Sequence, residues 1–179
     1  MTATRPGDRS APALPAADAF RSHDHQACRS TALAAVAAEC RDRGLKLTPA
    51  RTCVLEALLE SHQALTAYEL LDRLRAAGLG SQPPVAYRAL DFLVTHGFAH
   101  RIERLSAFVA CTHGSAHPGG PHAAGFLICR ICRAVAEADL SGVREALDAA
   151  AAAVSFGAER LTVEAEGLCA RCRAAEGRA

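Results

Sequence analysis

Residues 83–110 read PPVAYRALDFLVTHGFAHRIERLSAFVA, and the spacing of the apolar side chains changes in the middle of this stretch. Before Gly97 the apolar residues recur at helical spacing, and Pro83-Pro84 is typical of a helix start. After Gly97 the pattern predicts two short strands, residues 98–103 and 107–110, joined near Leu105-Ser106. The stretch therefore predicts a helix followed directly by a two-stranded hairpin. The face of this helix predicted to be buried contains Ala86, Ala89, Leu90 and Leu93.

Three more amphipathic segments precede this stretch. Helices are predicted from Cys28 to near Gly44, after the cap and first-turn proline Thr48-Pro49, and from Thr66 to Gly78. The third begins with a capping box, in which Thr66 and Glu69 satisfy each other's free backbone donors. A leading helix, three further helices and a hairpin describe a winged helix-turn-helix, whose last helix enters the major groove of DNA.

The rest of the chain divides into a tail, a linker and a second small domain. Residues 1–27 lack apolar periodicity and are predicted to be a disordered tail, which leaves 28–110 as the winged-helix domain. Residues 111–124 are rich in Gly and Pro and are predicted to be a hinge. Residues 125–179 are predicted to form a small α/β domain. Its expected elements are strands 126–128 and 134–138, a helix from 141 to about 154, and a strand from about 160 to 164.

The composition indicates that the core needs a supplement. The chain has 41 Ala, but only 38 residues that are Leu, Ile, Val or Phe. Two small domains that share so few large side chains have marginal cores without a metal or another cross-link. The eight Cys and eight His are the candidates for that role.

Several classes of protein are disfavoured by the sequence. The longest apolar run, Ala32–Ala38, is far shorter than the roughly 20 residues of a membrane helix, and residues 1–20 lack the apolar core of a secretory signal. The chain is therefore expected in the cytoplasm, where paired cysteines favour metal binding over structural disulfides. The formal net charge is only +1, so DNA binding would depend on a local patch.

Two C-x2-C pairs, Cys129/Cys132 and Cys169/Cys172, are the strongest chemical signal. Two such pairs complete a tetrahedral four-thiolate zinc site without an open position, which predicts a structural role. The 36 residues between the pairs exceed the usual zinc-ribbon gap, so the chain between them must fold back. A redox dithiol is the competing interpretation. Three of the other four cysteines, Cys28, Cys40 and Cys53, are expected to pack in helix faces as small hydrophobes.

A second possible ligand set comes from both predicted domains. It consists of a thiolate, two imidazoles and a carboxylate, which suit zinc and balance its charge. His113 and His117 are rival ligands in the linker, and each single His is by itself more often a surface residue. A metal held there would fix the angle between the domains. The set is His100, Cys111, His122 and Glu137.

The exposed face of the helix in the opening stretch offers DNA contacts. Arg88 can donate two hydrogen bonds to guanine, and Tyr87 can pack on a thymine methyl or bond a phosphate. Arg51 and Lys46 are candidates for phosphate contacts. The residues alone leave open the alternative that Arg88 pairs with Asp91 on a solvated face.

The chain resembles the ferric-uptake-regulator superfamily, and within it the zinc-uptake-regulator branch, over about residues 28–173. The resemblance implies an α+β fold, with an N-terminal winged helix and a C-terminal α/β dimerisation domain. It also implies a homodimer that binds zinc at two sites per subunit and represses metal-uptake genes from palindromic operators. The motifs that carry it are LTPAR (47–51), AYELLD (67–72), PPVAYRALDFL (83–93), GFAH (97–100), ICRIC (128–132) and GLCARC (167–172).

The resemblance also implies roles for individual residues. The four C-x2-C cysteines match the structural zinc site of the family, and the His100 set matches the regulatory zinc site. Residues 118–124 contain one His, where the iron-sensing branch has a His-rich stretch, which favours zinc over iron. Arg88 matches a base-contacting position.

This sequence departs from the family pattern at a few positions. The recognition helix has Val85-Ala86 where Thr-Val is usual, so a hydroxyl that can contact phosphate or cap the helix is missing. Arg133 stands where Gly is common, and Glu166 where His is frequent.

Other functions compete with a zinc-responsive repressor. An iron or peroxide sensor of the same superfamily is the nearest. A zinc enzyme is disfavoured, because both proposed sites are fully ligated and no small-molecule substrate is implied. A structural zinc-ribbon adaptor would leave the helix carrying Tyr87 and Arg88 without a role.

Overall fold

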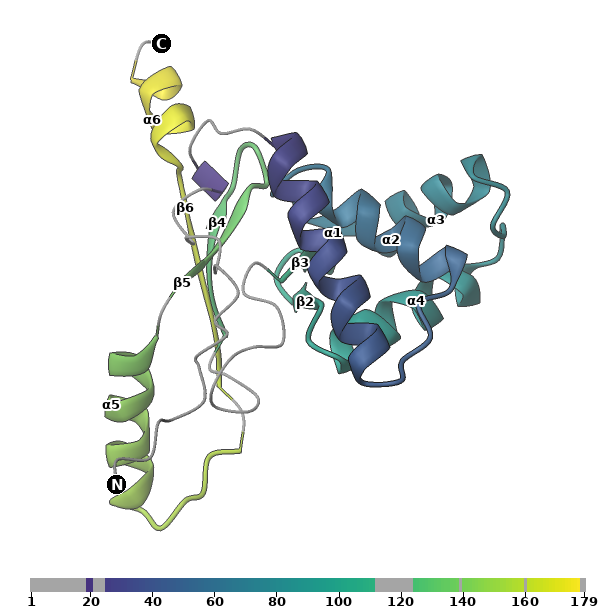
Figure 1. Ribbon diagram of the computed structural model, residues 1–179. Coiled ribbons are helices and arrows are strands. Elements are labelled where there is room, and N and C mark those ends of the chain that lie inside the picture. Colours follow the sequence, from purple (N-terminus) through teal and green to yellow (C-terminus); the bar gives the residue numbers. More distant parts are fainter. Residues whose placement is uncertain (1–18, 21–24, 112–123, 139, 160, 178–179) are drawn as a thin grey trace, which may run out of the picture.

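The computed structural model describes residues 19–20, 25–111, 124–138, 140–159 and 161–177. The chain folds into a helical N-terminal part and a sheet-based C-terminal part that lie side by side (Figure 1). Among the described residues, no helix is long and apolar enough to cross a membrane. The helices are α1 (His25–Asp42), α2 (Pro49–Leu59), α3 (Ala67–Ala76), α4 (Pro83–Thr95), α5 (Ser141–Ala152) and α6 (Ala170–Glu176). The strands are β1 (Leu65–Thr66), β2 (Ala99–Ile102), β3 (Ala107–Ala110), β4 (Ala124–Cys129), β5 (Val135–Ala138) and β6 (Thr162–Gly167).

The N-terminal part is the predicted winged helix-turn-helix. Helices α1–α4 enclose one core, and β2 and β3 form the antiparallel wing, with register from Ala99↔Ala110 to Ile102↔Ala107. The predicted apolar stripe of α4 is buried, with Leu93 fully buried. The turn after α4 needs positive φ, and Gly97 provides it at +78°.

The structure departs from the sequence predictions mainly in short elements. Helix α1 begins at His25, three residues inside the segment predicted as tail. Strand β1 was not predicted, because its two residues become a strand only by pairing with β3. Helix α6 was also missed, and it begins at the second C-x2-C pair, where the Cys169 side chain accepts a hydrogen bond from Cys172 N. Strand β6 runs Thr162–Gly167 instead of about 160–164.

The C-terminal sheet has the order β5-β4-β6, with β4 antiparallel to β5 and parallel to β6. In Figure 1, α5 and α6 lie at opposite ends of this sheet. The parallel register pairs Cys129 of β4 with Gly167 of β6. The two ends of the 36-residue gap therefore meet, as the zinc-site prediction requires.

The capping box of α3 is present as predicted. Thr66 N donates to Glu69 Oε2 at 2.6 Å, and Glu69 N donates to Thr66 Oγ1 at 3.3 Å. The hydrogen bond from the Thr66 backbone, followed by that from its hydroxyl, holds the pKa of Glu69 below its ordinary value. The carboxylate form of Glu69 therefore stabilises the folded state.

Thr66→Ala is expected to lower the free energy of unfolding by about 1 kcal/mol at neutral pH, because one capping partner is lost. Since the pKa of Glu69 is lowered on folding, its stabilisation is present above the ordinary carboxyl pKa and is lost as pH falls through the lowered one. The difference between wild type and variant should therefore shrink in acid. Urea unfolding at neutral and acidic pH measures it, with Thr95→Ala, exposed at the end of α4, as control. A difference that does not depend on pH would contradict the role of Glu69.

Candidate metal centres and DNA-binding face

The four C-x2-C cysteines form one cluster. Their sulfur atoms all lie within 4.8 Å of one another, and Cys132 Sγ is 3.9 Å from Cys169 Sγ. Cys129 ends β4, Cys132 lies in the following turn, and Cys169 and Cys172 lie at the start of α6. Phe20 and Leu168 pack against the cluster. The arrangement suits a single tetrahedral metal ion.

The cluster divides its thiols between charged and neutral forms when no cation balances them. Burial raises the pKa of Cys129, but hydrogen bonds from the backbone N–H groups of Cys169, Cys132 and Ile131 outweigh it and lower that pKa to about 6. Burial, and then hydrogen bonds with the other three cysteines, raise the pKa of Cys172 to about 12. A divalent ion would stabilise all four thiolates, and its binding would release protons.

Three of the four residues in the predicted regulatory set also come together. One donor atom from each of His100, Cys111 and Glu137 lies within 4.8 Å of the others, and His100 Nε2 is 3.3 Å from Glu137 Oε1. His100 lies on β2, Cys111 follows β3 and Glu137 lies on β5, so the group spans both parts of the chain. His122, and its rivals His113 and His117, lie outside the described residues.

Burial makes this group chemically unusual. Glu137 is 9% exposed. Among the residues that the structure describes, it is the one charged side chain that is buried. The His100 side chain is 12% exposed, and its ring lies beside that of Phe126 at an interplanar angle of 57°, with ring centroids 5.2 Å apart. A buried carboxylate is costly unless a cation or hydrogen bonds compensate it. A thiolate, an imidazole and a carboxylate together form a donor set that fits zinc.

The two parts of the chain are also joined by backbone pairing that the sequence did not reveal. Gln63, in the loop between α2 and β1, forms a β-bridge with Ala134. On either side of it, Val135 N donates to His62 O at 2.8 Å and Ala64 N donates to Arg133 O at 3.1 Å. This loop, residues 61–64, therefore extends the edge of the C-terminal sheet next to β5; we call the pairing the interdomain bridge.

Two of the three departures from the family pattern, Arg133 and Glu166, lie in contacts between the same two parts. Arg133 has a positive φ of 58°, which explains why Gly is common there, and its guanidinium is 3.4 Å from Glu69 of α3. Glu166 pairs with Arg104 of the wing turn at 2.7 Å. Beside it, Glu164 accepts hydrogen bonds from the backbone N–H groups of Glu103 and Arg104. Both side chains thus add ion pairs between the N-terminal part and the C-terminal part.

The predicted DNA-reading residues lie on the open face of α4. Tyr87 is 52% exposed, and Arg88 and Asp91 are exposed. Among the residues that the structure describes, no ion pair joins Arg88 to Asp91, and contact of Arg88 with DNA stays a prediction. Val85 packs against the helical core, which accommodates the side chain that replaces the usual Thr.

The two predicted phosphate contacts differ in their surroundings. Lys46 is exposed before α2. Arg51 lies over the ring of Phe92, with its guanidinium carbon 3.6 Å from the ring centroid, and donates to Lys46 O. Arg51 thereby joins α2 to α4 and fixes the segment that carries Lys46. Its contact with phosphate stays a prediction.

Comparison with known proteins supports the resemblance. The zinc uptake regulation protein of Escherichia coli (strain K12) is 40% identical over 133 residues, which cover 74% of this chain and 76% of that protein. A solved zinc uptake regulator complexed with zinc and DNA is 36% identical, covers 87% of this chain and 99% of that chain, and superposes with a TM-score of 0.75. The crystal structure of holo XcZur is 42% identical, with 82% and 99% covered and a TM-score of 0.71. No family model matches the chain. The identity and coverage show that this chain belongs to the family of zinc uptake regulation proteins.

Proposed function

We propose that this chain is a zinc-responsive repressor of zinc-uptake genes that binds a palindromic DNA operator as a zinc-loaded homodimer in the cytoplasm. The observation that carries the proposal is the group His100, Cys111 and Glu137, which joins the winged helix to the C-terminal sheet. The solved relative complexed with zinc and DNA supports it, because it matches nearly the whole described fold. Two zinc sites per subunit are proposed, and no enzymatic activity.

The four-cysteine cluster is proposed as the structural zinc site. It lies at one end of the C-terminal sheet, where few large side chains are buried. The cluster would take the place of an apolar core, because a metal bound by four thiolates adds directly to folding stability. Cys129, Cys132, Cys169 and Cys172 would be its ligands.

The regulatory site is proposed at the joint between the two parts. His100, Cys111 and Glu137 would hold the ion, and His122 is proposed as the fourth ligand. Bound zinc supplies a cross-link that only one relative placement of the two parts can satisfy. If that placement also fits the operator, zinc and DNA each favour the same conformation. By linkage, zinc then raises the affinity for DNA by the same factor as DNA raises the affinity for zinc.

Dimerisation is proposed through the C-terminal part, which leaves large apolar side chains exposed. Helix α5 carries Val143 at 46% and Leu147 at 37% exposed. Beyond it, Val154 and Phe156 are 74% and 66% exposed, and Leu127 of β4 is 44% exposed. Large exposed apolar side chains gathered in one part are typical of protein interfaces. A second copy related by a twofold axis would match a palindromic site.

In the proposed complex the exposed face of α4 reads the operator. Arg88 would contact guanine, Tyr87 a thymine methyl or phosphate, and Lys46 and Arg51 the phosphate backbone. Since the net charge is only +1, affinity would depend on these few contacts and on having two subunits.

Cys111→Ser is expected to abolish the effect of zinc on operator binding, because the thiolate at the joint is lost. Coupling of about 1–3 kcal/mol predicts that zinc tightens wild-type binding by about 5- to 150-fold. Gel shifts on a zinc-transporter promoter with and without zinc measure this ratio. Cys53→Ser, outside both clusters, is the control. If the variant kept the wild-type response with its four-cysteine site still loaded, the regulatory assignment would be wrong.

A further inference from the structure

Two carboxylates of the C-terminal sheet hold the turn of the wing. Glu164 accepts hydrogen bonds from the backbone N–H groups of Glu103 at 2.7 Å and Arg104 at 2.9 Å, one through each carboxylate oxygen. Glu166 lies on the same face of β6, because side chains alternate along a strand, and accepts from Arg104 Nε at 2.7 Å. We call these contacts the wing clamp. Hydrogen bonds to a charged acceptor are stronger than neutral ones, and two of them from consecutive amides also fix the orientation of the turn.

The wing clamp and the interdomain bridge hold opposite edges of one sheet. The strand order is β5-β4-β6, so the bridge lies beside β5 and the clamp acts on β6. None of the residues in these two contacts is a proposed zinc ligand. Between the two edges, the N-terminal and C-terminal parts share a buried apolar cluster, to which the wing contributes Ile102, Ala107 and Val109 and the sheet contributes Phe126, Ile128 and Val135.

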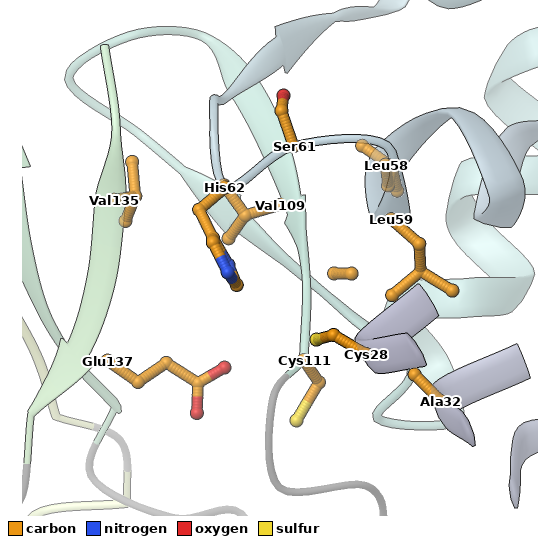
Figure 2. Close-up of a pocket in the computed structure, with 11 residues that line it drawn as sticks. Cys28, Ala32, Leu58, Leu59, Ser61, His62, Val109, Cys111, Val135 and Glu137 are labelled. Atoms are coloured by element: carbon orange, nitrogen blue, oxygen red, sulfur yellow. The ribbon is translucent and has the colours of Figure 1, made fainter. Parts of the chain in front are cut away.

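Packing is incomplete at the β5 edge. Figure 2 shows Val135 and Glu137 of β5 on one side of a cavity that His62 and Cys111 also line. Groups that face a cavity lack the dispersion contacts that close packing supplies. The regulatory group reaches this edge through Glu137. The contact that depends on zinc therefore lies at the β5 edge, whereas the wing clamp holds the β6 edge without a metal.

We propose that Glu164 is a positioning residue that sets the zinc concentration at which the regulatory site fills. The inference rests on the proposed function and concerns the regulation of that same site. Zinc binds the arrangement in which His100 and Cys111 meet Glu137, so its apparent affinity is reduced by the fraction of molecules that are in other arrangements. The wing clamp raises the fraction in the binding arrangement before zinc binds. The chain thereby responds to less zinc, although Glu164 does not contact the ion.

The same contacts occupy groups through which a wing turn could bind DNA phosphates. Backbone N–H groups and arginine side chains are common phosphate donors. Here the two N–H groups donate to Glu164, and the Arg104 guanidinium pairs with Glu166. The wing clamp therefore acts on DNA affinity through the placement of the two parts, and not through contacts of its own.

The test measures zinc affinity at the regulatory site of the full-length protein, with zinc alone against a competing chromophoric chelator. Glu164→Ala removes both backbone hydrogen bonds and should weaken this binding by about 5- to 20-fold. Glu164→Gln keeps the shape but loses the charge, and should weaken it by about 2- to 5-fold. Glu103→Gln is the control, because it makes the same chemical change in the wing turn but keeps the backbone N–H that Glu164 accepts.

Operator binding distinguishes positioning from a structural defect. At saturating zinc, every molecule is in the binding arrangement, so both Glu164 variants should bind the operator as wild type does, with the same dependence on salt. At limiting zinc they should bind it more weakly. The dimer mass and the zinc content of the four-cysteine site check that each variant is folded, and Glu164→Gln decides the test if Glu164→Ala is not.

Glu164 variants that bind regulatory zinc as tightly as wild type overturn this inference. A loss of operator affinity that persists at saturating zinc also overturns it, since the residue would then act on folding or on DNA directly. Wild-type operator binding that does not depend on zinc overturns the proposed function instead. The zinc titration needs no DNA, so it still tests the role of Glu164 in that case.

Discussion

Replacing Cys172 with serine is expected to unfold the C-terminal part and leave the protein monomeric. Cys172 is 7% exposed and lies on α6, whose start is fixed to the cluster by Cys169. A structural zinc site contributes an apparent binding free energy of about 10–16 kcal/mol, comparable with the entire stability of a domain, about 5–15 kcal/mol. Loss of one thiolate is therefore expected to remove enough zinc-binding free energy to unfold the domain.

The measurements are the zinc-to-protein ratio, the mass by sedimentation equilibrium and the thermal unfolding curve by circular dichroism. Zinc content should fall from about two ions per subunit toward none, because unfolding of the C-terminal part also removes Glu137 of β5 from the proposed regulatory site, and the dimer should disappear. Cys40→Ser replaces a buried cysteine of the helical core and should destabilise that core without loss of zinc. A Cys172→Ser protein that stays dimeric with unchanged zinc would show that the cluster is not the structural site.

Arg88→Ala is expected to remove most sequence-specific operator binding while zinc binding stays unchanged. A bidentate arginine–guanine contact is worth about 1–3 kcal/mol, and a homodimer on a palindrome makes it twice. The combined loss of about 2–6 kcal/mol corresponds to about 30-fold to more than 10⁴-fold in affinity. Arg88 is exposed and distant from the core stripe of α4, so the fold should be unaffected.

Fluorescence anisotropy on operator and scrambled duplexes separates sequence-specific binding from nonspecific electrostatic binding. Arg88→Ala should weaken operator binding selectively, whereas Lys46→Ala should weaken both duplexes and reduce the dependence on salt. Equal losses on both duplexes in Arg88→Ala would assign this residue to phosphate contact.

The features that could be predicted from sequence are those specified by local patterns. The stripe of α4, the Thr66–Glu69 box and the hairpin after Gly97 each follow from a few neighbouring residues. The two C-x2-C pairs were predicted to meet, because a four-thiolate zinc site needs both pairs around one ion. The approach of His100, Cys111 and Glu137 was implied by the family resemblance and is present in the fold.

The features that were missed depend on pairing between distant segments. Strand β1 and the interdomain bridge have no periodic signal, because two to four residues are too few to show one. Arg133 and Glu166 were recognised as departures, but their ion-pair partners, Glu69 and Arg104, lie more than 60 residues away in sequence. Nothing local predicts such partners.

The hydrogen bonds of the interdomain bridge can be used to measure how often the two parts of the chain separate. The amide protons of Ala64 and Val135 are hydrogen-bonded only across the joint. An amide exchanges with solvent when its hydrogen bond opens, so exchange of these two protons should report the equilibrium between the joined and separated arrangements of the two parts, and not global unfolding. Their exchange in deuterated water, followed by NMR as zinc and then operator are added, would therefore read out the conformational equilibrium itself. Neighbouring amides within α2 and β4 provide internal references in the same spectrum.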